Sequence, residues 1–226
     1  MTDAEIDYGE FRERIKEERR ADRRAAMAFV RACMTGNADM VDGAAHLLNE
    51  ETVTGWTIAV RKIAREVSEV SPDVRSAFLP IWIQTKMLPL RVGDHQALTK
   101  AARILLPPYC GPSLRLFRGT SADERRRRTY GFSWTSDIAI AETFAQERRC
   151  WNGGSVLLET VAPPEAIICA IGEASGNLYD ESEFAVDRRN LRAVRVLRRY
   201  AFEMPSRLTD PAPASAFPND DLSDPD

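Results

Sequence analysis

The pattern of apolar and polar residues divides the chain into two halves. Up to about residue 105, apolar residues recur every three to four positions, which is the spacing of one face of an α-helix. The clearest such stripe consists of Trp56, Val60, Ile63, Ala64 and Val67. The first half is therefore predicted to hold about five helices.

Helix start and stop signals divide this half further. Gly36 is expected to end the first helix, and Ser71 is expected to cap a helix that begins with a proline. That helix is predicted to run to about residue 87, with a kink or break at Pro80, and to be stopped by Pro89. Asp94 is expected to cap the last helix of this half.

A cluster of prolines and glycines at residues 107–112 marks the change to a second pattern. Beyond it, short apolar runs bounded by turn residues predict strands, with one helix at about residues 137–148. The predicted strands are 114–118, 155–159, 166–170, 183–187 and 193–197. Helices followed by strands predict an α+β protein.

Three segments follow from this division. Residues 1–110 are predicted to form a helical N-terminal lobe, and residues 111–203 a strand-rich catalytic core. Residues 204–226 are rich in Pro, Ala and Asp without periodicity, which indicates a disordered acidic tail.

Composition excludes several classes of protein. The chain has 226 residues and a net charge of −3, so whole-protein attraction to nucleic acid or to an anionic membrane is not expected. No stretch approaches the roughly 20 apolar residues of a membrane span. The acidic start lacks the apolar segment of a secretory signal. We expect a cytoplasmic protein, or one delivered into the cytoplasm of a target cell by another route.

The four cysteines argue against a stapled or metal-bound scaffold. Cys33, Cys110, Cys150 and Cys169 lie far apart and form no Cys-x-x-Cys pair. Disulfides and a zinc site are therefore not expected, and no metal is predicted.

The second half contains an arginine in an unusual place. In a strand, Leu116 and Arg118 would share one face while Phe117 points to the other, and Gly119 follows directly. An arginine on an inward face needs a partner, which a ligand could supply. Taken alone, this arginine is better explained by a buried ion pair or an exposed strand end.

Two further segments carry polar groups at strand ends. Ser133 and Thr135 alternate on a short strand before a helix that Ser136 or Asp137 could cap, so neither is needed as a cap. Glu181 and Glu183 would lie on one side of the entrance to a late strand. Two carboxylates this near to each other raise each other's pKa unless a cation or substrate is present. An exposed loop is the alternative explanation for the glutamates.

Together these segments resemble the Arg–Ser–Glu class of mono-ADP-ribosyltransferases over about residues 112–200. That class has an aromatic-Arg-Gly strand, a Ser-Thr-Ser strand, an Ala-x-x-Phe helix and a Glu-x-Glu turn, in this order. The matching positions here are Phe117 to Gly119, Ser133 to Thr135, Ala141 to Phe144, and Glu181 to Glu183. Trp134 replaces the central threonine of the triplet, as in a variant seen in phage and bacterial proteins.

The resemblance implies a split β-sandwich with an NAD cleft between its sheets. It implies that NAD is a substrate, and that ADP-ribose passes to a macromolecular acceptor while nicotinamide leaves. The implied catalytic residues are Glu183, Glu181, Ser133 and Arg118. The implied NAD-binding residues are Arg118, Gly119, Ser133, Trp134, Thr135, Phe144 and Glu183.

The chemistry suits these residue types. Breaking the bond between nicotinamide and ribose develops an oxocarbenium-like cation, as in glycoside hydrolysis. Arg118 would hold the pyrophosphate through its fork of donors, and Glu183 would stabilise the cation. Ser133 would orient that glutamate, and Glu181 would position or deprotonate the nucleophile. In the family, a glutamate at the position of Glu181 is associated with arginine acceptors, so a protein arginine is favoured.

Three alternatives remain open. The same residues would serve an NAD glycohydrolase, in which water is the nucleophile. A non-catalytic scaffold could use the helical lobe to bind a partner. Modification of nucleic acid through the arginine-rich segments 124–128 and 188–199 would predict a continuous basic face leading to Glu183. If the protein is a toxic effector of bacterial or phage type, a neutralising partner is expected.

Overall fold

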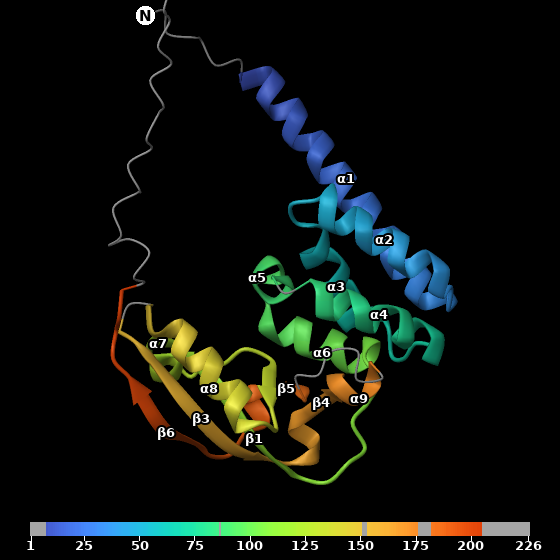
Figure 1. Ribbon diagram of the computed structural model, residues 1–226. Coiled ribbons are helices and arrows are strands. Elements are labelled where there is room, and N and C mark those ends of the chain that lie inside the picture. The colour runs from blue at the N-terminus through green and yellow to red at the C-terminus, as the bar shows by residue number, and fades with distance from the viewer. Residues whose placement is uncertain (1–7, 86, 151–152, 176–181, 205–226) are drawn as a thin grey trace, which may run out of the picture.

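The computed structural model of the protein describes residues 8–85, 87–150, 153–175 and 182–204. In this part of the chain, six helices come first and form a lobe above a strand-rich part (Figure 1). The lobe contains α1 (Tyr8–Thr35), α2 (Ala38–Glu50), α3 (Gly55–Glu66), α4 (Pro72–Gln84), α5 (Leu88–Val92) and α6 (His95–Leu105).

The predicted caps are confirmed where the structure describes them. The side chain of Ser71 accepts a hydrogen bond from the backbone of the first turn of α4, and that of Asp94 does the same for α6.

The prediction that Pro89 stops the helix begun at Ser71 was wrong. Pro89 lies in the first turn of α5, where a missing N–H costs no helical hydrogen bond. Pro80 lies inside α4, which ends at Gln84.

The second half supplies strands separated by short helices. In chain order these are β1 (Leu114–Ser121), α7 (Ala122–Arg127), β2 (Ser133–Thr135), α8 (Ile138–Glu147), β3 (Ser155–Ala162), β4 (Ile167–Ala170), α9 (Ile171–Ala174), β5 (Glu183–Val186) and β6 (Val194–Tyr200). The described strands form one antiparallel sheet in the order β4-β5-β2-β1-β3-β6. The α+β class is thus confirmed, and one hydrogen-bonded sheet takes the place of the two that were expected.

One short connection requires this sheet to bend. Only residues 163–166 join β3 to β4, although three strands separate them in the sheet. Crossing four strand spacings of a flat sheet would take about 19 Å. The connection reaches about 17 Å when fully extended, and it contains a helical turn. The two halves of the sheet therefore curve toward each other.

The bend encloses a core on the inner face of the sheet. Leu116 and Leu158 come from one half, and Trp134 and Phe184 from the other, and all four belong to one buried apolar cluster. The connection between β5 and β6 is tied to that between β3 and β4, because the Asp187 N–H donates to the Ala166 carbonyl at 2.8 Å. The outer face thus remains for helices to cover.

Two sets of helices cover the outer face. Helix α8 packs on β1 and β3 through Ala141 and Ala145. At the other end of the sheet, Phe132, Ile168 and the neighbouring apolar residues join the core of the helical lobe. The change from helices to strands lies between α6 and β1, but the division into separate domains stays a prediction. No described helix has the length and apolar character that crossing a membrane requires.

Candidate functional site

The predicted serine and glutamate meet across two neighbouring strands. Thr135 on β2 is the register partner of Glu183 on β5, so the side chains of Ser133, Thr135 and Glu183 lie on one face of the sheet. The Ser133 hydroxyl donates a hydrogen bond to Oε1 of Glu183. Fifty positions separate these residues in the chain, and the ladder between β2 and β5 brings them together.

Arg118 joins this pair through the backbone. Its Nη1 donates to the carbonyl oxygen of Ser133 at 2.5 Å, and its Nη2 lies 3.5 Å from Oε2 of Glu124. The side chain is 9% exposed, so this is a buried cation. A side chain at Gly131 would begin 2.8 Å from Nη2, so glycine leaves the space that the guanidinium occupies.

The electrostatics of Arg118 leave it ready to bind an anion. Burial lowers its pKa to about 10, the Glu124 carboxylate opposes this, and the nearby Arg148 adds to it. The group is still a cation at neutral pH. Its buried Nε donates to no acceptor among the described residues. A buried, charged donor with unused capacity is favourable for a phosphate oxygen.

Arg148 is a site residue that the sequence did not single out. Its Nη1 donates to the carbonyl oxygen of Gly119, and its guanidinium lies 5.7 Å from the centre of the Phe144 ring. Two arginines therefore flank Gly119, one on β1 and one at the end of α8. In the sequence Arg148 is one of a pair of arginines after a helix, which is also typical of solvated residues.

Glu124 was missed for a similar reason. It belongs to the charge run 124–128, and such runs are usually solvated. Ser121 caps α7, and this cap directs Glu124 back over β1, where it accepts a hydrogen bond from the Thr120 hydroxyl beside Arg118. Only the geometry of the turn after β1 makes Glu124 a neighbour of Arg118.

Gly119 has a packing role. A Cβ there would lie 2.3 Å from both the Ala141 carbonyl oxygen and the Ala145 nitrogen. Glycine thus allows the backbone of α8 to touch β1, which places Phe144 and Arg148 beside the strand. This contact explains why an Ala-x-x-Phe helix pairs with an Arg-Gly strand.

One implied residue, Trp134, is not brought to the cluster. Trp134 is 1% exposed and points into the inner core, on the opposite face of β2 from Ser133, where its ring packs edge-on to Tyr130. Glu181 lies outside the described residues. Thr135 is buried at the start of α8, where its hydroxyl accepts a hydrogen bond from the Asp137 backbone.

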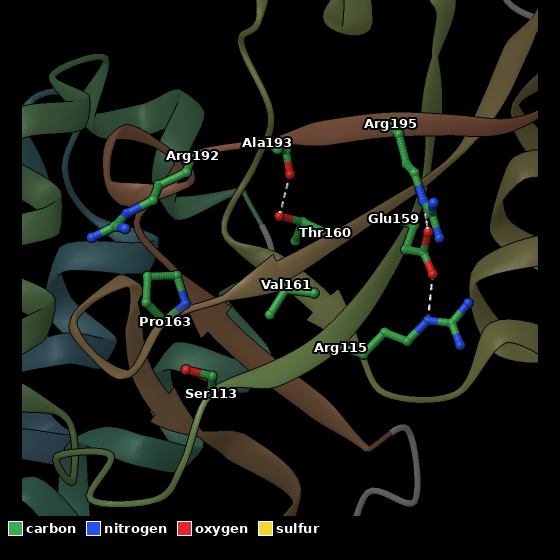
Figure 2. Close-up of a pocket in the computed structure, with 9 residues that line it drawn as sticks. All are labelled: Ser113, Arg115, Glu159, Thr160, Val161, Pro163, Arg192, Ala193 and Arg195. Carbon is green, nitrogen blue, oxygen red and sulfur yellow. Dashed lines mark hydrogen bonds and ion pairs between the residues drawn. The ribbon is translucent and has the colours of Figure 1, made fainter.

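A hollow of about 620 Å³ lies elsewhere on the sheet, between β1, β3 and β6 (Figure 2). Arg115, Glu159 and Arg195 line it, and none of the Arg118, Ser133 or Glu183 side chains does. The candidate site and this groove are therefore separate features of one protein.

Among the described residues, no group of three or more His, Cys, Asp or Glu side chains is placed to hold a metal ion. Burial raises the pKa of the Cys33 and Cys169 thiols to about 12, so neither is a thiolate at neutral pH.

Comparisons of the chain with protein-family models, with curated proteins and with solved structures found no match.

Proposed function

We propose that the protein is a mono-ADP-ribosyltransferase that cleaves NAD at Glu183 and passes ADP-ribose to a protein acceptor. The observation that carries this proposal is the connected chain of Arg118, Ser133 and Glu183, in which three distant segments meet through two hydrogen bonds. These are the three positions on which the resemblance to the Arg–Ser–Glu class depends. The bent sheet would then be a form of the split sandwich of that class.

Each residue has a distinct role in the proposed reaction. Arg118 and Arg148 supply positive charge around Gly119, where the pyrophosphate would bind. Ser133 holds the Glu183 carboxylate in one orientation by donating to it. Glu183 stabilises the positive charge that develops on the ribose as nicotinamide leaves. Glu181, two positions before Glu183, is proposed to act on the nucleophile.

The role of Gly119 and Phe144 in NAD binding is proposed to be indirect, through the seating of α8. Trp134 is proposed as a core residue of the site, since its side chain points away from Ser133. The proposed acceptor is a protein arginine, and the proposed setting is the cytoplasm of a producing or target cell. A bacterial or phage effector with a neutralising partner would fit this activity.

The first test is release of nicotinamide from NAD by the purified full chain, with and without cell lysate. We expect release that falls at least about 10²-fold in Glu183→Gln and in Ser133→Ala, because the first removes the charge that stabilises the transition state and the second removes the hydrogen bond that orients it. Dependence of release on lysate would indicate transfer to an acceptor. Release at full rate without lysate would favour the glycohydrolase.

Matched variants make the result interpretable. Glu147→Gln changes an exposed glutamate at the end of α8, and Ser136→Ala an exposed serine just after β2. Both are expected to keep wild-type release and a wild-type melting temperature. If no nicotinamide is released under any condition and NAD does not raise the melting temperature, the enzyme hypothesis is wrong and the binding scaffold is the better explanation.

A further inference from the structure

A groove on the outer face of the sheet carries a second cluster of charge. It is lined by residues at the start of β1, the end of β3 and the start of β6 (Figure 2). Among its nine lining residues are the three arginines Arg115, Arg192 and Arg195 and the single acid Glu159. The groove therefore carries a net positive charge, although the whole chain is negative.

Glu159 holds two of these arginines in place. Its side chain is 3% exposed, and its two oxygens accept hydrogen bonds from Nε of Arg115 and from Nε of Arg195. Figure 2 shows the two guanidinium groups on either side of the carboxylate. Both bonds use Nε, so the terminal amino groups of both arginines remain for another acceptor. Arg115 is held further by its contact with the Phe117 ring, at 5.3 Å from the ring centre.

The arginines remain accessible despite this fixation. The side chains of Arg115 and Arg195 are 63% and 70% exposed. Arg192, at the other end of the groove, is exposed and makes no ion pair with a described residue. Glu159 already orders the side chains of both arginines. A second carboxylate that binds the two guanidinium groups therefore loses less side-chain entropy.

The surface between the arginines is apolar. Val161 is 64% exposed, and Pro163 and Ala193 lie beside it in the lining. No aromatic side chain is among the lining residues, so nucleic-acid bases would have no ring on which to stack. Fixed guanidinium groups around exposed aliphatic side chains suit an extended peptide that carries acidic residues.

We propose that this groove docks an acidic segment of the protein acceptor; the term acceptor rests on the proposed function. The groove and the Ser133–Glu183 pair of the candidate site lie on one face of the sheet, whereas Arg118, the register partner of Leu158, lies on the inner face. Glu183, Thr135, Phe117, Glu159 and Arg195 are successive register partners across five strands. Helix α8 packs on Phe117 in this row and on Gly119 beside it, and the groove opens on the Ser113 side.

The length of this row sets the distance between the acidic residues of the acceptor and the side chain that is modified. Measured along the curved sheet, four strand spacings amount to about 19 Å, so an extended chain that follows the outer face would need at least about six residues. An acceptor is therefore expected to carry acidic residues about six or more positions from the side chain that is modified. Binding in the groove and chemistry at Glu183 could then occur on the same segment.

The test measures binding by fluorescence anisotropy at low salt, with the full chain and without NAD. The probe is a labelled ten-residue Gly/Ser peptide that carries four glutamates; the same peptide with four glutamines and a ten-nucleotide oligothymidine are compared with it. We expect the glutamate peptide to bind and the glutamine peptide not to bind. Arg195→Gln should weaken binding at least about fivefold, because it removes one of two fixed forks.

The matched control is Arg61→Gln. Arg61 also has a half-exposed side chain in an ion pair, with Asp94 of the helical lobe, so both variants remove one charge and one ion pair. We expect it to bind the glutamate peptide as the wild type does. The inference would be overturned if the glutamate peptide did not bind, or if both variants lost the same affinity for it. It would also be overturned if the oligothymidine bound more tightly than the peptide and Arg195→Gln weakened that binding.

The same variant separates this inference from the proposed reaction. If both hold, Arg195→Gln raises KM for an arginine peptide with distant glutamates, while nicotinamide release into water keeps its wild-type rate. A chain that binds the glutamate peptide through Arg195 but never releases nicotinamide would support the groove as a docking site and overturn the reaction.

Discussion

Arg118 and Glu124 form a largely buried contact between opposite charges at the candidate site. The Arg118 side chain is 9% exposed and that of Glu124 is 32% exposed, with 3.5 Å between Nη2 and Oε2. Glu124 is thus the anion that partly balances Arg118 in the protein without substrate. A pyrophosphate that binds Arg118 would make a similar contact, so the two anions are expected to compete or to share the guanidinium.

Glu124→Gln tests this relation. Loss of the carboxylate leaves a buried cation less well paired, and we expect the free energy of unfolding to fall by about 2 kcal/mol. ADP should then stabilise the variant more than it stabilises the wild type, because its phosphates replace the missing charge. Urea unfolding with and without ADP measures both effects. A variant that ADP stabilises less than the wild type would show that Glu124 helps to bind the nucleotide.

At the scale of residues, the sequence predicted the members of the site that carry a motif. Arg118 could be singled out because it lies within an apolar strand just before a glycine, and Ser133 and Glu183 because each begins a strand in a local pattern. Glu124 and Arg148 could not, because nothing local distinguishes them from the solvated charges beside them. Their roles depend on where a helix cap and a helix end fall relative to β1.

Helix α8 is held against β1 at a point where the two backbones touch. A Cβ on Gly119 would lie 2.3 Å from the backbone of α8, so Gly119→Ala must push the helix away. We expect a loss of about 2–3 kcal/mol of stability, since backbone cannot move aside as a side chain does. Activity should fall as well, because Phe144 and Arg148 move with the helix. Denaturant unfolding and nicotinamide release measure the two effects.

Gly43 is the matched control for this substitution. It lies inside α2, and a Cβ there would meet nothing within 4 Å. Gly43→Ala is expected to raise stability by up to about 1 kcal/mol, because alanine favours a helix more than glycine does. If both variants lost stability equally, the contact between α8 and β1 would not be the cause.

The contact between α6 and the residue before β2 is expected to depend on pH. The His95 ring stacks on Phe132 at 4.5 Å, with a buried Nε2 that has no partner among the described residues. Burial lowers the pKa of His95 to about 4, and the positive charge of Arg188 adds to this. The folded protein therefore favours neutral His95.

The sign follows from the two protonation states. Between pH 6.5 and about 4 the unfolded chain binds a proton at His95 that the folded protein does not, so stability is lost as the pH falls through this range. For a partly exposed ring we expect about 1 kcal/mol between pH 7 and pH 5. His95→Phe keeps the stacked ring and should remove this part of the pH dependence. His46→Phe, on the exposed side of α2, should leave it unchanged in urea titrations at both values.

At the scale of elements, local signals predicted where most helices and strands lie. The exceptions have physical causes. Val67 was counted in the apolar stripe of the third helix, but α3 ends at Glu66 and Val67 is extended. Its side chain is buried all the same, so the spacing of apolar residues could not show where the helix ends. The order of the strands could not be read from the chain, because β3 and β4 are adjacent in sequence and far apart in the sheet.

The helical lobe and the sheet share one apolar core. Phe132 packs edge-on to Trp82 of α4 at 5.5 Å and stacks on His95 of α6. The core of the lobe also includes Ile168 and Ala185 from β4 and β5. The first half is therefore a structural support for the strand that carries Ser133, in addition to any partner that it binds.

This shared core predicts that the two halves unfold together. The full chain is expected to show one cooperative transition by circular dichroism and by fluorescence, with coincident midpoints. Trp82→Ala should lower stability by about 3 kcal/mol and lower nicotinamide release, although Trp82 lies outside every motif. The matched variant Leu90→Ala removes an exposed side chain of α5 and should change neither.

A fragment of residues 111–226 would expose Phe132, Ile168 and Ala185, so we expect it to remain unfolded. A fragment that folds and cleaves NAD would instead show that the lobe is a separate domain, and that Phe132 needs no cover to hold β2 in place.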